Sequence, residues 1–186
     1  MLKAKDPQQF ADFITGLCGD LIQINLSNFG IFDKFTGDGI LSFFPDFFSG
    51  EDSIYRAIKA ANECHVCFHK HYDDKRHCFN SILTQVGLGI GIDYGEVHLA
   101  KMEDGLTVIG TPVVYACRFS GDKADSTLLN QSAYEIAAQR YGGYVNFQEY
   151  ETNVKHEGET LAYLATLGKQ AYQSKMPPWL NPPPTP

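Results

Sequence analysis

The chain has 186 residues, of which 44% are hydrophobic and 20% are charged, a composition typical of one globular domain with a single core. Its formal net charge of −7 excludes the broad positive surface that nucleic acid or an anionic membrane requires, so we expect neither partner. No apolar run approaches the ~20 residues of a membrane-spanning helix. The five cysteines are an odd number without a framework spacing, which favours reduced thiols and predicts a cytoplasmic protein.

The first part of the chain predicts two helices with a strand hairpin between them. Residues 7–24 place apolar side chains at three- and four-residue spacing, which indicates an amphipathic helix. In residues 30–44, two short strand-like runs lie on either side of residues 36–39, TGDG, a composition that favours a hairpin turn. Residues 54–68 again have helical spacing, and the charged run at 73–78 predicts a connection.

The second part predicts further strands and two more helices. Residues 85–101 suggest a second strand pair that turns at residues 93–95, DYG. Residues 87–92, GLGIGI, superficially resemble a phosphate loop, but their apolar alternation favours strand glycines at a close packing contact. In chain order, the remaining patterns predict a strand at 106–109, a helix beginning near Pro112, a strand at 127–130, a helix at 131–141 and strands near 144–150 and 160–166. Hairpins among alternating strands and helices indicate a mixed α/β sandwich rather than a parallel sheet.

Three segments, taken in order, carry a resemblance to a known family. The first is DKFTGDG at residues 33–39, the second is GIDYGEV at 91–97, and the third is TVIGTPVVYACR at 107–118. A weaker fourth match is NVK at 153–155. The likeness spans about residues 8–166, and the ordered set resembles the catalytic domain of class III adenylyl and guanylyl cyclases.

The resemblance implies an α/β (α+β) fold, a ferredoxin-like mixed-sheet sandwich of class III cyclase type. The family places a strand ahead of the helix at 7–24. We therefore expect residues 1–168 to form a catalytic domain that is truncated at its N-terminus and lacks its first strand. Residues 169–186 are rich in proline, and we interpret them as an extended tail.

The resemblance also implies an activity. The protein would convert a nucleoside triphosphate, with ATP as the first expectation, to a 3′,5′-cyclic nucleotide and pyrophosphate. The family uses two divalent metals, Mg²⁺ or Mn²⁺, which activate the ribose hydroxyl and neutralise charge on the phosphates. Cations and metal aspartates come from opposite subunits in the family, so one chain that carries both sets suggests a homodimer with two equivalent sites.

Four residues match positions that hold the metals and the phosphates. Asp38 matches a metal aspartate, and a carboxylate in a hairpin turn suits a hard cation. Gly37, beside it, is expected at the substrate. Arg118 matches the arginine that meets charge on the α-phosphate, and Lys155 matches a lysine at the terminal phosphates.

Two residues match positions that contact the base. The Lys34 ammonium would donate to the N1 acceptor of adenine, whereas guanine presents a donor there. The Thr107 hydroxyl would accept from the adenine amino group. Together they predict ATP as the substrate, although a solvated strand lysine and an edge threonine would have the same sequence.

The chain departs from the family at two places. The first metal aspartate has no match, because Asp12 is too close in sequence to Asp38 for the elements expected between them; we predict that Asp12 is a surface helix residue. Val114 stands where the family usually has an asparagine that orients the ribose, and valine forms no such hydrogen bond. The departure at Val114 puts full activity or the usual substrate in doubt.

Three alternatives remain open. Bacterial cyclases that make cyclic UMP or cyclic CMP in anti-phage defence share the fold and vary in the base pocket. A degenerate cyclase homologue would bind nucleotide or dimerise without turnover. A structural zinc site is suggested by the cluster Cys64, His65, Cys67, His69, His71, His77 and Cys78, although helical patterning favours ordinary packing.

Overall fold

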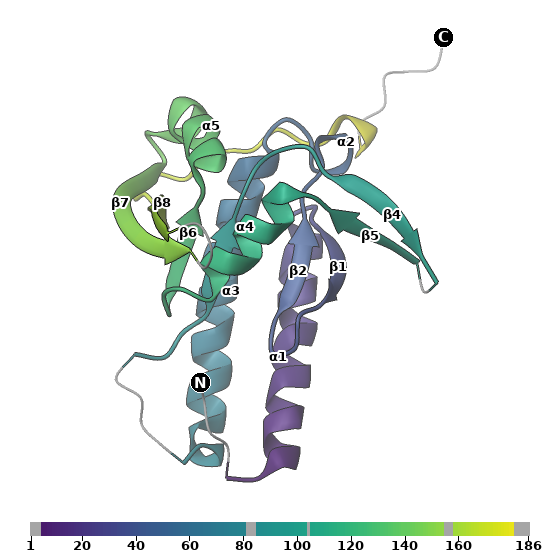
Figure 1. The fold of residues 1–186 in the computed structure, drawn as a ribbon, viewed down its shortest axis with the longest axis vertical. Coiled ribbons are helices and arrows are strands. Elements are labelled where there is room, and N and C mark those ends of the chain that lie inside the picture. The colour runs from purple at the N-terminus through teal and green to yellow at the C-terminus, as the bar shows by residue number, and fades with distance from the viewer. Residues whose placement is uncertain (1–4, 81–84, 104, 155–157, 181–186) are drawn as a thin grey trace.

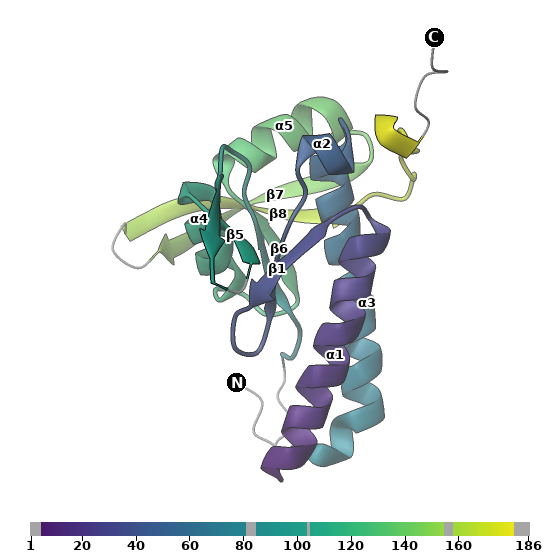
Figure 2. The same cartoon turned by 90° about the vertical axis from the view of Figure 1, so that its right-hand side faces the viewer.

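Two long antiparallel helices form one side of the molecule (Figures 1 and 2). The computed structural model describes residues 5–80, 85–103, 105–154 and 158–180. Helix α1 (Pro7–Ser27) begins at Asp6, whose carboxylate accepts a hydrogen bond from the Gln8 amide, and it packs along helix α3 (Ser53–Lys75). Buried side chains from both helices form one apolar cluster, which includes Phe13, Leu17, Leu21, Cys64, Phe68 and Tyr72. Both predicted helices are confirmed.

The charged run at 73–78 is not the connection that we expected. Residues 73–75 complete α3, and a short 3₁₀ turn, η1 (Arg76–Cys78), follows. The helix continues because Tyr72 still packs in the apolar cluster, stacked on Phe68, so the last turn has a buried anchor.

The hairpin predicted at 30–44 is confirmed as β1 (Ile31–Phe35) and β2 (Ile40–Phe43), which pair antiparallel. The register shifts between Phe32 and Lys34, so Asp33 is the extra residue of a β-bulge. A bulge turns the side chain of its extra residue away from the regular alternation. This one directs Asp33 towards β5 (Gly105–Ile109).

The strand pair predicted at 85–101 is wrong. Strand β3 (Gly89–Ile92) pairs in parallel with β6 (Ser126–Leu129), whereas β4 (His98–Met102) pairs antiparallel with β5. At the end of β3 the Asp93 carboxylate accepts hydrogen bonds from the side-chain NH₂ group of Asn130 and from the Ser132 hydroxyl. These contacts tie the expected turn to the beginning of α5 (Gln131–Tyr141) instead of letting the chain fold back on itself.

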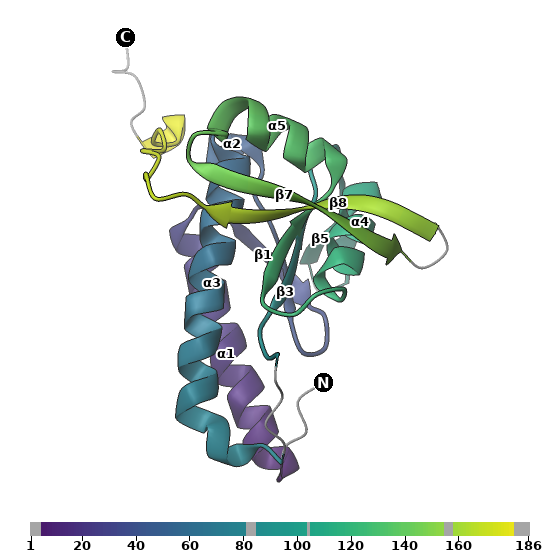
Figure 3. The same cartoon turned by 90° about the vertical axis from the view of Figure 1, so that its left-hand side faces the viewer.

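The main sheet has the strand order β3-β6-β8-β7, with β7 (Val145–Val154) and β8 (Gly158–Leu167) as a long antiparallel pair (Figure 3). Its parallel and antiparallel pairs confirm the predicted mixed α+β sandwich. The hairpins β1–β2 and β4–β5 form two separate two-stranded sheets. The main sheet therefore has β3 at one edge, and helix α4 (Thr111–Ser120) lies against that strand.

The strand glycines make the close contacts that the sequence predicts. A Cβ atom added to Gly89 would lie 2.0 Å from the Ser120 carbonyl oxygen, and one added to Gly91 would lie 2.0 Å from the Ala116 carbonyl oxygen. Both clashes involve backbone of α4, which has little room to move away. The glycines thus set how closely α4 approaches β3.

Residues that follow β8 are fastened to α3 and α2 (Asp46–Ser49). The buried Asp52 carboxylate accepts from the Lys175 amide, and the Arg56 guanidinium donates to the Lys175 carbonyl. Beyond them, the Trp179 ring in η2 (Pro178–Leu180) stacks on Phe48 with 5.1 Å between centroids. No helix in the described part of the chain is long and apolar enough to cross a membrane.

Candidate active site

The two hairpins meet at one buried carboxylate. The Asp33 side chain has no exposed surface, and its Oδ2 accepts a hydrogen bond from the Thr107 hydroxyl at 2.8 Å. Its Oδ1 accepts from the Val108 amide at 3.0 Å. The Asp33 carboxylate thus accepts the hydrogen bond that a neighbouring strand would otherwise accept from the Val108 amide. It links β1 to β5, although the two strands belong to separate sheets.

The structure brings together the two residues predicted to contact the base. The Lys34 Nζ lies 3.4 Å from the same Asp33 Oδ2 that accepts from Thr107, so one carboxylate oxygen serves both side chains. The Lys34 side chain is about half exposed, and Thr107 is half-buried. Because the Thr107 proton is donated to Asp33, the threonine oxygen keeps its lone pairs for an incoming donor.

The turn between β1 and β2 presents Asp38 and Gly37 to solvent. Gly37 has a φ of +102°, a conformation that side-chain-bearing residues rarely adopt, and this accounts for glycine at this position. The amide of Thr36 donates to the Gly39 carbonyl at 2.9 Å and closes the turn. Asp38 is thus an exposed carboxylate on a short turn that a backbone hydrogen bond closes.

Helix α4 carries Arg118 in its last turn. Burial raises the pKa of the neighbouring Cys117 thiol, and the positive charge of Lys34 opposes this rise. The Arg118 guanidinium lies over the Tyr115 ring, 6.0 Å from its centroid. Val114, one helical turn earlier, is 45% exposed, so the valine that stands in place of the expected asparagine is accessible to solvent.

The other sequence predictions have mixed outcomes. Asp12 is exposed and accepts a hydrogen bond from the Gln8 side chain at 2.9 Å, which confirms it as a surface helix residue. Lys155 lies outside the described residues, and its role stays a prediction. The sequence reasoning missed Asp33 because the bulge that redirects it is invisible in the strand pattern. The available signal was a carboxylate between the apolar residues of a short strand, since such a group needs a partner if it is buried.

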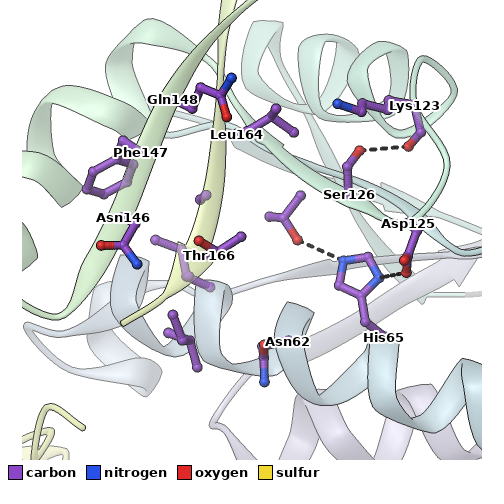
Figure 4. A pocket seen from close by; sticks show the side chains of 14 residues that line it. Asn62, His65, Lys123, Asp125, Ser126, Asn146, Phe147, Gln148, Leu164 and Thr166 are labelled. Carbon is purple, nitrogen blue, oxygen red and sulfur yellow. Dashed lines mark hydrogen bonds and ion pairs between the residues drawn. The ribbon is translucent and has the colours of Figure 1, made fainter. Parts of the chain in front are cut away.

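A cavity of about 370 Å³ lies elsewhere, between α3 and the strands β6, β7 and β8 (Figure 4). His65 projects from α3 into this region, where its Nε2 lies 3.0 Å from the Thr127 hydroxyl. Burial lowers the pKa of the His65 imidazole, against the opposing effect of Asp125. Neither this cavity nor a second one, lined by residues that include Asp46, Tyr94 and Arg140, is lined by Lys34, Thr107 or Arg118. Neither cavity is therefore the predicted nucleotide site.

Comparison with solved structures gives close agreement in fold. The chain is similar to the guanylyl cyclase Cya2, with a TM-score of 0.70 and 19% identity over 88% of this chain and 84% of that one. It is similar to the adenylyl cyclase CyaB from P. aeruginosa, with a TM-score of 0.69 and 19% identity over 90% and 87%. The guanylate cyclase domain of RhGC from Catenaria anguillulae, in complex with GTP, gives 0.63 and 17% over 89% and 87%.

No family model matches the chain, and no curated protein matches it by sequence. The likeness therefore concerns the arrangement of helices and strands, at sequence identities of 15–19% for six of the similar structures. It extends over nearly nine-tenths of the chain and confirms the fold that the ordered motifs predict. The chain has the fold of the class III adenylyl and guanylyl cyclase catalytic domains.

Proposed function

We propose that this protein is a nucleotidyl cyclase that converts ATP to 3′,5′-cyclic AMP and pyrophosphate at a site shared by two copies of the chain. The observation that carries the proposal is the joint contact of Lys34 and Thr107 with the buried Asp33 carboxylate. The likeness in fold to solved adenylyl and guanylyl cyclases supports the reaction class. The choice of base is argued from the side chains of this chain alone.

The Lys34–Thr107 pair offers one donor and one acceptor to the base. Lys34 only donates, and Thr107, whose proton is held by Asp33, accepts. Adenine presents the complement, a ring-nitrogen acceptor beside an amino donor, and cytosine presents the same pattern. Guanine and uracil place a carbonyl where the amino group would be and an N–H where the ring acceptor would be. The pair therefore favours ATP, and CTP is the pyrimidine that fits it.

The reaction is an in-line displacement within one nucleotide. The ribose 3′-hydroxyl loses its proton to solvent water and its oxygen forms a bond to the α-phosphorus, while the bond from that phosphorus to the bridging oxygen breaks and pyrophosphate leaves with the bonding electron pair. Arg118 would stabilise the negative charge that develops on the α-phosphate oxygens. Lys155 would hold the terminal phosphates and the leaving pyrophosphate.

Asp38 is the residue that we assign to a divalent metal. Its carboxylate is exposed on the turn, whereas the Asp33 carboxylate is buried and already occupied by two donors. One or two carboxylates together with substrate phosphates are the usual protein environment of Mg²⁺, so Asp38 fits a metal that arrives with the nucleotide. Bound there, Mg²⁺ or Mn²⁺ would supply charge neutralisation and a lowered pKa for the ribose hydroxyl.

The exposed apolar side chains of the β4–β5 hairpin support a homodimer. Lys34 and Thr107 lie on the two hairpins and Arg118 lies on α4, and none of the three lines either cavity described above. The β4–β5 hairpin extends away from the body of the fold (Figure 1) and exposes large apolar side chains along its length. A second copy would cover these side chains and close the nucleotide cleft.

The test is turnover of ATP, GTP, CTP and UTP with Mn²⁺ by the full chain, with the cyclic products identified by mass spectrometry. We expect cyclic AMP, a smaller amount of cyclic CMP, and little product from GTP or UTP. The variant Lys34→Glu should lower the ATP-to-GTP ratio of kcat/KM by at least about tenfold, because a carboxylate now faces the acceptor nitrogen of adenine. Lys169→Glu, at an exposed lysine after β8, is the matched control.

Other products would lead to other conclusions. Cyclic UMP as the main product would retain the reaction and refute the base assignment, and it would favour the anti-phage alternative. If none of the four nucleotides gives a cyclic product, nucleotide binding without turnover becomes the better description, with Val114 as the first residue to restore to asparagine.

A further inference from the structure

Three side chains of different chemistry meet where α1 packs on α3. Asp20 comes from α1, while Cys67 and His71 come from α3, four residues apart and so on one face of that helix. The ligand atoms of the three all lie within 4.8 Å of one another. Among the described residues, this is the one group of three or more potential metal-binding side chains that are so close together.

The group is already held in place by the packing around it. His71 Nε2 lies 2.7 Å from Asp20 Oδ2, and the Phe13 ring meets the imidazole edge-on at 6.5 Å between centroids. Cys67 and His71 are half-buried above the apolar cluster of the two helices, whereas Asp20 is exposed. An ion can therefore reach the group from solvent, and the side chains that would bind it are already held in position by packing.

The donor set selects the kind of ion. A sulfur, an imidazole nitrogen and a carboxylate oxygen suit a borderline-soft cation such as Zn²⁺, whereas Mg²⁺ prefers oxygen ligands only. Three protein ligands leave one tetrahedral position for water, the arrangement of exchangeable zinc sites rather than closed structural ones. Binding would release the thiol proton, because the thiolate is the ligand, and would replace the Asp20–His71 hydrogen bond.

We propose that Asp20, Cys67 and His71 form a Zn²⁺ site that links α1 to α3. The site is separate from the metal position proposed at Asp38, a carboxylate in the turn between β1 and β2. The earlier zinc hypothesis, drawn from the cysteines and histidines of residues 64–78, needs revision. Cys64 and Cys78 are buried in the apolar cluster, and His69 is bonded to Asp125 instead. The third ligand, Asp20, comes from the other helix.

The test measures metal binding to the full chain without nucleotide, so that its result does not depend on cyclase activity. Metal-free protein is titrated with Co²⁺ as a spectroscopic probe and then with Zn²⁺. We expect one equivalent of Co²⁺ to give a thiolate-to-cobalt charge-transfer band, which Zn²⁺ then abolishes. Zn²⁺ should also raise the unfolding temperature, because it binds the folded helix pair.

Matched variants separate ligands from neighbours. Cys67→Ser, His71→Gln and Asp20→Asn should each weaken Zn²⁺ binding by more than about 100-fold, since outer-shell partners alone account for 10–100-fold. The controls carry the same substitutions at residues outside the group: Cys117→Ser, His69→Gln and Asp12→Asn. Circular dichroism verifies that each variant is folded, and three independent ligand variants keep the test decisive if one of them fails to fold.

Two results would overturn the site. The first is wild-type protein that binds Co²⁺ and Zn²⁺ without saturation at one equivalent. The second is saturable binding that survives in His71→Gln as well as it does in His69→Gln.

Discussion

At the scale of single residues, Asp33 determines how the two hairpins present their side chains. Its carboxylate is fully buried and accepts from the Thr107 hydroxyl and the Val108 amide, while Lys34 lies 3.4 Å away. A buried carboxylate is stable only when its oxygens are satisfied. Asp33 therefore fixes both the position of Thr107 and the direction of its proton.

We predict that Asp33→Asn loosens this arrangement. The amide oxygen still accepts from the Val108 N–H, which can only donate, so the NH₂ group faces the Thr107 hydroxyl and the Thr107 proton loses its acceptor. The free energy of unfolding should fall by about 1–3 kcal/mol, measured by urea denaturation. The ATP-to-GTP ratio of kcat/KM should fall with it, because the Thr107 proton is no longer directed inward.

The control for this prediction is Asp12→Asn, an exposed carboxylate on α1. Unchanged base preference in a folded Asp33→Asn protein would show that Asp33 has only a structural role.

Gly91 is the second residue whose identity is explained by a close contact, because α4 packs directly against it. We predict that Gly91→Ala destabilises the protein by about 1–3 kcal/mol or more, because the new Cβ would lie 2.0 Å from the Ala116 carbonyl and force α4 away from β3. Gly143→Ala, where the added Cβ has no neighbour within 4 Å, should change stability by less than 1 kcal/mol, about the range of a surface substitution. Equal effects in thermal denaturation would contradict the packing argument.

At the scale of elements, Asp52 joins the chain after β8 to the beginning of α3. As the residue before the helix it makes no side-chain hydrogen bond to the helix amides. Its carboxylate instead accepts from the Tyr141 hydroxyl at 2.7 Å, from the Lys175 amide at 2.7 Å and from the Tyr172 hydroxyl. Burial and this carboxylate raise the pKa of Tyr141, which keeps its hydroxyl protonated as the donor.

We predict that Asp52→Ala lowers the free energy of unfolding by about 3 kcal/mol or more, because three donors, one in α5 and two in the chain after β8, lose their acceptor. The neighbouring Glu51→Ala removes only an exposed ion pair with the Lys175 side chain and should cost less than about 1 kcal/mol. Limited proteolysis would show cleavage near residues 169–175 in Asp52→Ala alone. Similar stabilities for the two variants would refute the fastening role of Asp52.

The elements show what local sequence determines. Both long helices, the first hairpin and the strand β6 were predictable, because each has its own apolar period and bounding turn residues. The pairing of β3 with β6 was not, because it depends on Asp93 binding the beginning of α5, far along the chain. A turn-like tripeptide predicts a hairpin only where its side chains do not form hydrogen bonds with residues far along the chain.

The candidate site divides in the same way. The motifs identified Lys34, Asp38, Thr107 and Arg118, since each lies in a short segment with a recognisable order. The carboxylate that links two of them, and the partner Asp20 of Cys67 and His71, come from contacts between distant segments. Sequence patterning gave the residue types, and only the packing of hairpins and helices shows which of them share a neighbour.

At the scale of the whole molecule, the exposed apolar surface of the β4–β5 hairpin is where the proposed second copy would pack. Leu106 is 63% exposed and Ile109 is 52% exposed on β5, and Met102 on β4 is 57% exposed. We predict that Leu106→Glu weakens self-association by at least about tenfold in sedimentation equilibrium, because a charge would be buried in the interface. Val66→Glu, at a valine of α3 that is 67% exposed, should leave it unchanged.

A mixing experiment distinguishes a shared site from one that each chain completes alone. Asp38→Asn and Arg118→Ala should each be inactive under the proposed mechanism, since one lacks the proposed metal carboxylate and the other the proposed α-phosphate cation. In a heterodimer of the two, a shared-site geometry places both defects in one cleft and leaves the other cleft intact. Mixed in equal amounts under exchange conditions, the variants should therefore recover about a quarter of wild-type turnover, as expected for a two-fold symmetric dimer.

The same mixture gives a different result if each chain completes its own site. Every site then carries one of the two defects, and mixing restores nothing. Recovery must also disappear when Leu106→Glu is added to both variants, because the heterodimer no longer forms. Recovery that persists without association would contradict the shared site, and absence of recovery in a demonstrated heterodimer would place Asp38 and Arg118 in one cleft of one chain.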